Sequence, residues 1–207
     1  MIVVIDSGIS NIGSVMTALQ RIGAEAKATR SRAEVEAADS LLLPGVGAFG
    51  DGMAALRHHD LVEPIRAHAA AGKPILGICL GMQLLASESE EFGTHTGLDL
   101  IPGRVRRLRP QAGFRIPNIG WCGLRAREDA SLFAEMPPDA CFYFVHSYVV
   151  DCAAAEDSAG LLDFGEETAT VAVERGRIFG AQFHPEKSQD AGLAVLDAFR
   201  RICETPQ

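Results

Sequence analysis

The sequence predicts an α/β fold with a mostly parallel central sheet flanked by helices and an antiparallel strand extension. In the first half of the chain, short and wholly apolar runs alternate with segments of helical periodicity, which is typical of parallel strands covered on both faces. The second half carries shorter, alternating strands instead. Because no repeat, low-complexity segment or linker divides the chain, we expect residues 1–207 to form one domain.

The first elements are a strand over residues 2–5 and a helix that Asn11 can cap and Gly23 can end. The strand is apolar and largely β-branched. The apolar residues of the helix fall on one stripe, which comprises Ile12, Val15, Met16, Leu19 and Ile22.

The strand and helix pattern then repeats up to residue 86. The expected elements are a weak strand at 25–29, a short helix from Ser31, a strand at 41–43, helical stretches at 53–56 and 61–70, a buried strand at 74–78 and a helix at 80–86.

In the second half we expect antiparallel ribbons and a closing helix. The ribbons are expected at 103–108, 141–145, 168–173 and 178–182. Ser188 can cap the last helix, whose inward-facing residues are Leu193, Leu196, Phe199 and Ile202.

Composition excludes several classes of protein. With 27 acidic and 19 basic side chains the net charge is −8, which argues against nucleic acid as the main ligand. No apolar run reaches the ~18 residues of a membrane span, and the N-terminus lacks a basic leader, so we expect neither membrane insertion nor secretion. The five cysteines are scattered without a CxxC pair, so we expect a reducing cytoplasm, no disulfide framework, no metal and no cofactor.

The sharpest local signal is Gly77-Ile78-Cys79-Leu80-Gly81, a nucleophile elbow with Cys at its centre. Side chains at the two glycine positions would collide with the neighbouring strand and helix. The helix N-terminus favours the thiolate by ~0.3–1 kcal/mol, up to ~2 kcal/mol, which is too little alone, so a base is required. A buried structural thiol is the alternative.

The candidate bases are His184 and His146, since the other four histidines lie on polar helical stretches or in a loop and are expected to be solvated. In Phe183-His184-Pro185-Glu186, residues two apart on an extended chain point to the same side, so Glu186 can orient the imidazole of His184. A carboxylate in that place also stabilises the imidazolium that forms when the thiol loses its proton.

A glycine-rich segment follows the strand at 41–43 and can supply amide donors. In elbow hydrolases the oxyanion is held by the N–H after the nucleophile, here Leu80, and by one from an adjacent loop. Val46 and Gly47 are the candidates for the second donor, and a turn without chemistry is the alternative. The absence of GxxxxGK[ST] excludes a P-loop.

Together these residues resemble the class I, triad-type glutamine amidotransferases, and among them the glutaminase subunits of imidazole glycerol phosphate synthase. The segments that carry the resemblance are Leu43-Pro44-Gly45-Val46-Gly47, Gly77-Ile78-Cys79-Leu80-Gly81-Met82-Gln83, Pro117-Asn118-Ile119-Gly120-Trp121, Tyr143-Phe144-Val145-His146-Ser147-Tyr148 and Phe183-His184-Pro185-Glu186-Lys187-Ser188. They span nearly the whole chain.

The resemblance implies hydrolysis of the glutamine side-chain amide through a γ-glutamyl thioester on Cys79, with His184 as the base that Glu186 orients. It also implies that glutamine is bound by Gln83, His146, Ser147, Tyr148 and Glu91.

The resemblance further implies a partner, a (β/α)₈ cyclase subunit that receives ammonia through an internal channel in histidine biosynthesis, forming a heterodimer. An amide of the segment 44–47 would have to turn before it stabilises the oxyanion. Candidate interface residues are Trp121, Tyr143 and Lys187, although Trp121 also fits a core position.

Three alternatives stay open from the sequence: another triad-type amidotransferase subunit, another α/β elbow hydrolase, and a non-catalytic scaffold of this fold. Ser7 and Cys122 depart from the family's usual Tyr and Asn. Arg104, Arg106, Arg107 and Arg109 have no catalytic explanation and are expected to form a solvated ribbon, with a partner or phosphate contact as the alternative.

Overall fold

The computed structural model describes residues 1–137 and 139–205. Its first half contains β1 (Ile2–Ile5), α1 (Ile12–Arg21), β2 (Ala26–Thr29), α2 (Arg32–Glu36), β3 (Ser40–Gly45), α3 (Phe49–His58), α4 (Val62–Ala70), β4 (Ile75–Cys79) and α5 (Leu80–Leu84). The second half contains β5 (Ala86–Ser89), β6 (His95–Thr96), β7 (Ile101–Arg107), β8 (Asn118–Gly123), β9 (Arg125–Ala126), β10 (Cys141–His146), β11 (Tyr148–Cys152), β12 (Ser158–Phe164), β13 (Glu167–Arg175), β14 (Ile178–Ala181) and α6 (Gln189–Glu204). Single 3₁₀ turns lie at Ser131–Phe133, Ala155–Asp157 and Pro185–Lys187.

A mixed sheet runs through the described part of the chain in the order β2-β1-β3-β4-β14-β13-β11-β7-β5-β6. The strands from β2 to β14 pair in parallel, and β13 begins the antiparallel extension. Strands β10 and β8 form a separate antiparallel ribbon. The predicted fold class is therefore confirmed, with one correction: residues 178–181 pair in parallel with β4 as well as antiparallel with β13, so they join the two parts of the sheet.

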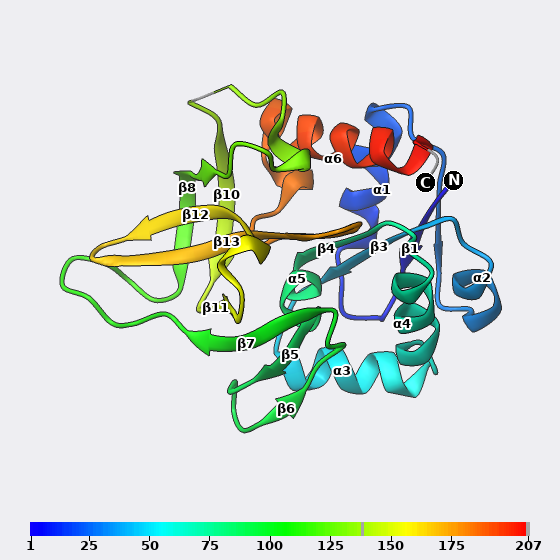
Figure 1. Cartoon of the computed structure of the whole chain (residues 1–207), viewed down its shortest axis with the longest axis horizontal. Coiled ribbons are helices and arrows are strands. Elements are labelled where there is room, and N and C mark those ends of the chain that lie inside the picture. The colour runs from blue at the N-terminus through cyan, green and yellow to red at the C-terminus, as the bar shows by residue number, and fades with distance from the viewer. Residues whose placement is uncertain (138, 206–207) are drawn as a thin grey trace.

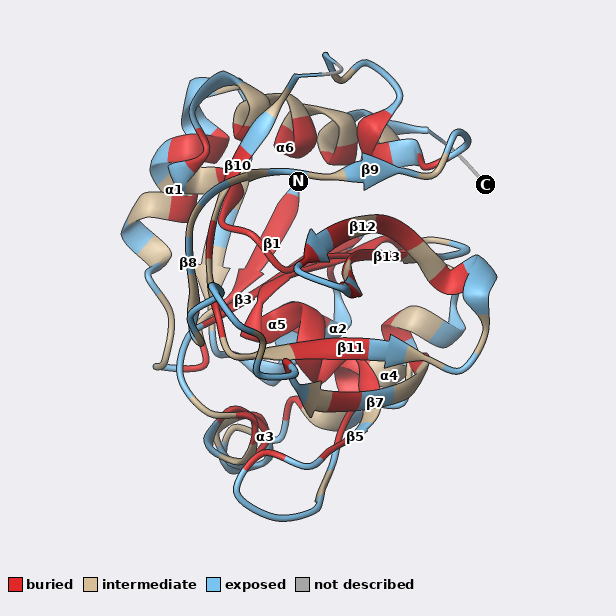
Figure 2. Cartoon of the chain, turned by 90° about the vertical axis from the view of Figure 1, so that its left-hand side faces the viewer, coloured by how far each residue is buried: buried red, intermediate tan, exposed pale blue. Residues whose placement is uncertain are grey.

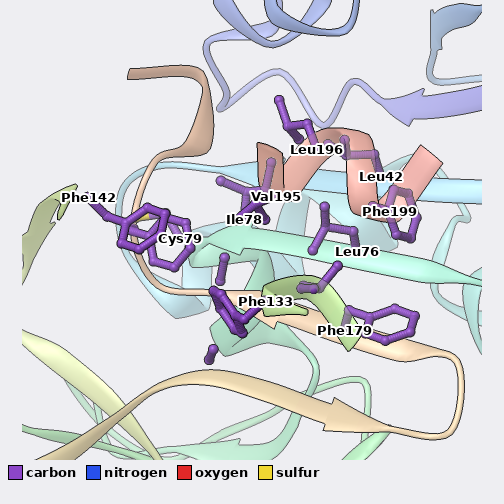
Figure 3. Packing of buried hydrophobic residues seen from close by; sticks show 14 of the residues in the cluster. Leu42, Leu76, Ile78, Cys79, Phe133, Phe142, Phe179, Val195, Leu196 and Phe199 are labelled. Atoms are coloured by element: carbon purple, nitrogen blue, oxygen red, sulfur yellow. The ribbon is translucent and has the colours of Figure 1, made fainter. Parts of the chain in front are cut away.

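Helices cover both faces of the parallel strands (Figure 1). Alternate residues of the strands separate two cores, as the two-residue period requires. Ile2, Val4 and Leu42 pack in the cluster that includes α1 and α6, whereas Val3 and Leu41 pack in the cluster that includes α2, α3 and α4. Figure 3 shows Val195, Leu196 and Phe199 of α6 above the strands in the first of these cores.

The two predicted helix caps have different outcomes. Asn11 caps α1, since its side-chain oxygen accepts the N–H of Ser14 at 3.4 Å. Ser188 is the N-cap residue of α6 and its carbonyl accepts the N–H of Gly192 at 3.0 Å, but its side chain makes no capping hydrogen bond. Its hydroxyl instead donates to the carbonyl of His184 at 2.6 Å and accepts the N–H of Tyr143 at 2.9 Å. Ser188 therefore fixes the turn that carries His184.

The predicted helix over 80–86 is too long, because α5 ends at Leu84 and β5 begins at Ala86. The carbonyl of Leu85 accepts the N–H groups of Leu100 and Ile101 at 2.8 and 3.0 Å, so pairing with the distant strand β7 overrides the local helical preference. The strands not predicted from the sequence are β5, β6, β8, β9, β11 and β12.

Burial differs between the central parallel strands and the outer antiparallel strands β8 and β9 (Figure 2). β1 and β3 are buried along their length, while β8 alternates half-buried and exposed residues and β9 is exposed.

Within the cluster of arginines between 104 and 109, Arg106 pairs with the buried Glu167 at 2.5 Å, so Arg106 is not merely solvated.

One histidine of α4 differs from its prediction. His68 is buried, which contradicts the expectation that it is solvated. None of the helices within residues 1–137 and 139–205 is long and apolar enough to cross a membrane.

Candidate functional site

Cys79 lies at the junction of β4 and α5 in a strained backbone conformation, with φ 54° and ψ −110°. The flanking glycines are required there. A Cβ on Gly77 would lie 2.6 Å from the carbonyl oxygen of Gly81, and a Cβ on Gly81 would lie 1.7 Å from that of Leu43. This sharp turn presents the Cys79 side chain at the carboxyl end of the parallel strands.

Cys79 and His184 are far apart in the sequence, and the parallel pairing of β4 with β14 brings them close together in space. Ala181 of β14 pairs with Ile78 of β4, so the residues that follow β14 run beside Cys79. The N–H of His184 then donates to the carbonyl of Tyr143 at 2.9 Å, which ties the segment to β10.

The imidazole of His184 is held by Glu186. Nδ1 donates to Oε1 of Glu186 at 2.8 Å, and both side chains are buried. Glu186 lies in a 3₁₀ turn over Pro185–Lys187, whereas the sequence predicted an extended chain. The turn, rather than the two-residue alternation of a strand, therefore brings the side chains of His184 and Glu186 together. Because Nδ1 is engaged, Nε2 is the nitrogen left to serve Cys79; it has no hydrogen-bond partner among the described residues.

The pKa of His184 reflects these neighbours. Burial by itself would lower it, but the interactions with Cys79 and Glu186 outweigh burial and raise the pKa of His184 to about 9. The ring therefore favours the imidazolium form in this site. A histidine that gains its proton from a neighbouring thiol has this preference.

His146, the other candidate base, has both ring nitrogens engaged. Nδ1 donates to the carbonyl of Tyr148 at 3.0 Å, and Nε2 accepts from Nδ2 of Asn118 at 3.1 Å. Burial lowers the pKa of His146 to about 4, so the ring is neutral near pH 7. Of the two histidines, only His184 has a nitrogen available for proton transfer.

A cavity of about 350 Å³ opens over Cys79. It brings together ten of the residues singled out from the sequence: Val46, Gly47, Cys79, Leu80, Gln83, Glu91, His146, Ser147, Tyr148 and His184. It is also lined by Phe92, Pro117 and Val145, none of which was a candidate site residue, although Pro117 and Val145 lie in segments that carry the resemblance.

Polar groups at two sides of this cavity are already bound to the protein. Oε2 of Glu91 accepts the N–H of Phe49, the first residue of α3, at 2.7 Å. Nε2 of Gln83 donates to the carbonyl of Tyr148 at 3.2 Å and to Oε1 of Gln182 at 2.9 Å. Gln83 therefore has only its oxygen, an acceptor, to offer a ligand.

The candidate oxyanion donors are not equally available. Leu80 is the first residue of α5, where a helix leaves its N–H groups without intrahelical partners. The N–H of Val46, by contrast, donates to the carbonyl of Ile9 at 2.9 Å. Gly47 follows with φ 98° and open space where a Cβ would lie, and Val46 is 41% exposed. In this conformation Val46 cannot serve an oxyanion.

The three candidate interface residues form one cluster. The rings of Trp121 and Tyr143, on the paired strands β8 and β10, lie 5.9 Å apart edge to face, and Nζ of Lys187 lies 6.0 Å from the Tyr143 ring centroid. Trp121 is 49% exposed, so the core interpretation of this residue is wrong.

The sequence reasoning missed Gln182, which is fully buried and donates to Sγ of Cys79 at 3.8 Å. The available signal was its position immediately before Phe183-His184-Pro185-Glu186, which places it next to the proposed base.

Comparison with known proteins gives concordant matches. A family model described as glutamine amidotransferase class-I matches residues 3–200. The chain is 48% identical to the imidazole glycerol phosphate synthase subunit HisH of Moorella thermoacetica, over 97% of this chain and 94% of that protein. It is 47% identical to the protein of the same description from Chloroflexus aurantiacus, over 100% of this chain and 98% of that one.

Solved structures share the fold at lower identity. One described as a glutamine amidotransferase superimposes with a TM-score of 0.77 at 20% identity, covering 98% of this chain and 99% of the other. A chain of PurLQS from Thermotoga maritima gives a TM-score of 0.74 at 18% identity, covering 97% of each.

Proposed function

The chain belongs to the class-I glutamine amidotransferase family, and from this premise we propose how its residues perform the reaction of the glutaminase subunit of imidazole glycerol phosphate synthase. The observation that carries the proposal is the Glu186–His184 pair, whose free Nε2 serves Cys79 at the floor of the cavity.

Cys79 acts as the nucleophile. His184 takes the thiol proton on Nε2, and the sulfur attacks the side-chain amide carbon of glutamine. His184 returns that proton to the departing nitrogen, so ammonia leaves and a γ-glutamyl thioester remains. Water, deprotonated by the same nitrogen, then attacks the thioester, and glutamate is released with the thiol restored. Glu186 keeps the ring oriented throughout.

The oxyanion of each tetrahedral intermediate needs two N–H donors. Leu80 supplies one. The second comes from the segment 44–47, and we assign it to Val46 with Gly47 as the flexible neighbour. Since the Val46 N–H is bound to Ile9 in this structure, the peptide must turn first, and we therefore expect low glutamine hydrolysis by the chain alone.

The cavity walls bind glutamine. Glu91 faces the substrate ammonium with the carboxylate oxygen that Phe49 leaves free, and the side-chain oxygen of Gln83 accepts from the same group. His146, Ser147 and Tyr148 form a further part of the cavity wall, which adjoins Gln83.

The chain is a subunit of imidazole glycerol phosphate synthase, which implies a cyclase partner. We propose that this partner is a (β/α)₈ barrel that takes up the ammonia for histidine biosynthesis, in a heterodimer located in the cytoplasm. The half-exposed Trp121, its neighbour Tyr143 and the cation of Lys187 support an interface at this cluster. Residues 1–207 act as a single amidotransferase domain in this proposal.

The test is Cys79→Ala, assayed in complex with the cyclase. We expect glutamine-dependent synthesis to fall by about 10³-fold or more, while synthesis from ammonium salts is retained. The matched control is Cys141→Ala, which removes an exposed thiol and is expected to leave both activities unchanged. Retained use of glutamine by Cys79→Ala would contradict the proposal. Failure of a glutamine-like electrophile to label Cys79 in the complex would favour the non-catalytic scaffold instead.

A further inference from the structure

Two glutamine side chains connect a backbone carbonyl on one side of the cavity to the sulfur of Cys79. Nε2 of Gln83 donates to the carbonyl of Tyr148 at 3.2 Å and to Oε1 of Gln182 at 2.9 Å. Nε2 of Gln182 then donates to Sγ of Cys79 at 3.8 Å. The hydrogen bonds thus run in one direction, toward the sulfur.

The direction of this chain is fixed by chemistry. A backbone carbonyl only accepts, so the atom of Gln83 that faces Tyr148 must be the amide nitrogen. The same nitrogen faces Gln182, so the atom it meets there must be oxygen. The amide nitrogen of Gln182 is consequently left facing Cys79, and the reverse orientation would place two donors against each other.

The position of Gln182 is set by the sheet. The residue follows β14, whose last residue Ala181 pairs with Ile78, immediately before Cys79. Its backbone N–H donates to the carbonyl of Val171 at 2.9 Å, and the whole residue has no exposed surface. Burying an amide is costly unless its polar atoms are bonded, and here Oε1 accepts from Gln83 and Nε2 donates to Sγ of Cys79. The fold therefore holds a fully bonded amide against the sulfur in a place with no exposed surface.

We propose that Gln182 is a further catalytic residue, which favours the thiolate of Cys79 by donating an N–H to Sγ, and that Gln83 positions its amide for this task. The inference rests on the proposed role of Cys79 as the nucleophile. The thiol proton still goes to Nε2 of His184, and Gln182 gains or loses no proton. A thiolate accepts a hydrogen bond far better than a thiol sulfur does, so this bond favours the charged form.

Other ionisable groups around the sulfur do not supply this donor. Besides His184, the titratable side chains that line the cavity are Glu91, His146 and Tyr148. His146 is neutral, with both nitrogens engaged. Glu91 brings a negative charge that opposes a thiolate. Within residues 1–137 and 139–205, the amide of Gln182 is the uncharged side-chain donor that contacts Sγ.

The experiment measures the rate at which iodoacetamide alkylates Cys79 in the isolated full-length chain between about pH 5 and pH 10. Peptide mass mapping separates Cys79 from the exposed Cys141, whose labelling serves as the internal reference. The variants are Gln182→Met, which keeps the length without a donor, Gln182→Glu, which keeps the shape and adds a charge, and Gln83→Met, which removes only the partner that orients Gln182.

For Gln182→Met we expect the pH of half-maximal labelling to rise by about one unit and the rate at pH 7 to fall about tenfold. Gln182→Glu should shift the profile further, because the carboxylate repels the thiolate, and Gln83→Met should shift it less. A role in packing alone would change the plateau rate at high pH without moving the midpoint. Circular dichroism shows which variants fold. If the pH of half-maximal labelling does not change in the folded variants, the inference is overturned. Where Gln182→Met does not fold, Gln182→Glu and Gln83→Met decide the question.

The assay separates this inference from the proposed function, since iodoacetamide requires neither glutamine nor a partner. If the profiles do not move but Cys79→Ala still abolishes the use of glutamine, the function stands and the role of Gln182 falls. If the profiles move but glutamine is never hydrolysed, the hydrogen bond stands and the function falls.

Discussion

Two regions flank Cys79, because they follow β3 and β14, which lie on opposite sides of β4 in the sheet, and they differ in how completely they are built. On one side, His184 and Glu186 are buried, joined at 2.8 Å and locked by Ser188 through the His184 carbonyl. On the other side, the segment 44–47 carries the exposed Val46. Its N–H donates to the carbonyl of Ile9 and is therefore not available to an oxyanion.

The difference indicates which step the chain can perform alone. Forming and using a thiolate needs only the buried groups, which are in place. Stabilising a tetrahedral oxyanion needs both regions, and one lost donor typically costs about 10²–10³-fold in rate. We infer that the chain alone is assembled to form the thiolate but not for turnover of glutamine.

Among changes that leave Cys79 in place, the largest effect is expected from Glu186→Gln. The amide cannot hold the Nδ1 proton as a carboxylate does, so both Cys79 alkylation and glutamine hydrolysis in the complex should fall, the latter by about 10²–10⁴-fold. Parallel kinetic assays of the variant check this. Unchanged alkylation would show that the pair does not activate Cys79.

Trp121→Ala should weaken binding of the cyclase by about tenfold or more, because a half-exposed aromatic is a typical interface anchor. Titration calorimetry measures the effect, and Cys79 alkylation in the free chain should not change. The matched control is Phe114→Ala, which truncates a similarly exposed aromatic residue that contacts Phe164 and is not part of the Trp121–Tyr143 pair. Equal binding by both variants would place the interface elsewhere.

Stability should depend on pH through His184. Its pKa is raised from 6.5 to about 9, so between these values the folded chain holds a proton that the unfolded chain has released. This contribution to the free energy of unfolding is complete below about pH 6.5 and is lost as the pH rises through about 9. Urea unfolding between those values should show the loss in the wild type and a smaller loss in Glu186→Gln. Equal slopes would contradict the interaction.

The smallest effect is expected from His68, which lies outside both regions. Burial lowers the pKa of His68 from 6.5 to about 4. Between about pH 6.5 and pH 4, His68 is therefore protonated in the unfolded chain but not in the folded chain. Stability is therefore lost as the pH falls through this window. His68→Gln should unfold at a slightly lower pH than the wild type, with the exposed His58→Gln as the control. Identical acid midpoints for the two variants would refute this.

The sequence sufficed for the parts of the site that depend on local geometry. The spacing of Gly77, Cys79 and Gly81 follows from steric limits at a tight turn, and the apolar runs of β1, β3 and β4 follow from burial on both faces. These constraints act within a few residues, so a single sequence reveals them.

The rest depends on contacts between distant segments. The bond from Val46 to Ile9, the bond from Asn118 to His146 and the path from Tyr148 to Cys79 each join segments far apart in the sequence, and no spacing encodes them. The same holds for α5, whose early end at Leu84 is imposed by pairing with β7. Side-chain orientation in a shared cavity is decided by packing and hydrogen-bond complementarity, which appear only once the sheet is formed.

One paired measurement tests the contrast between the two regions most directly. Cys79 alkylation by iodoacetamide and glutamine hydrolysis are measured on the same preparation, first with the free chain and then with the cyclase and its ligand. We predict that alkylation changes by less than about threefold while glutamine hydrolysis rises by about 10²-fold or more. A parallel rise of both rates, or full hydrolysis by the free chain, would contradict the account.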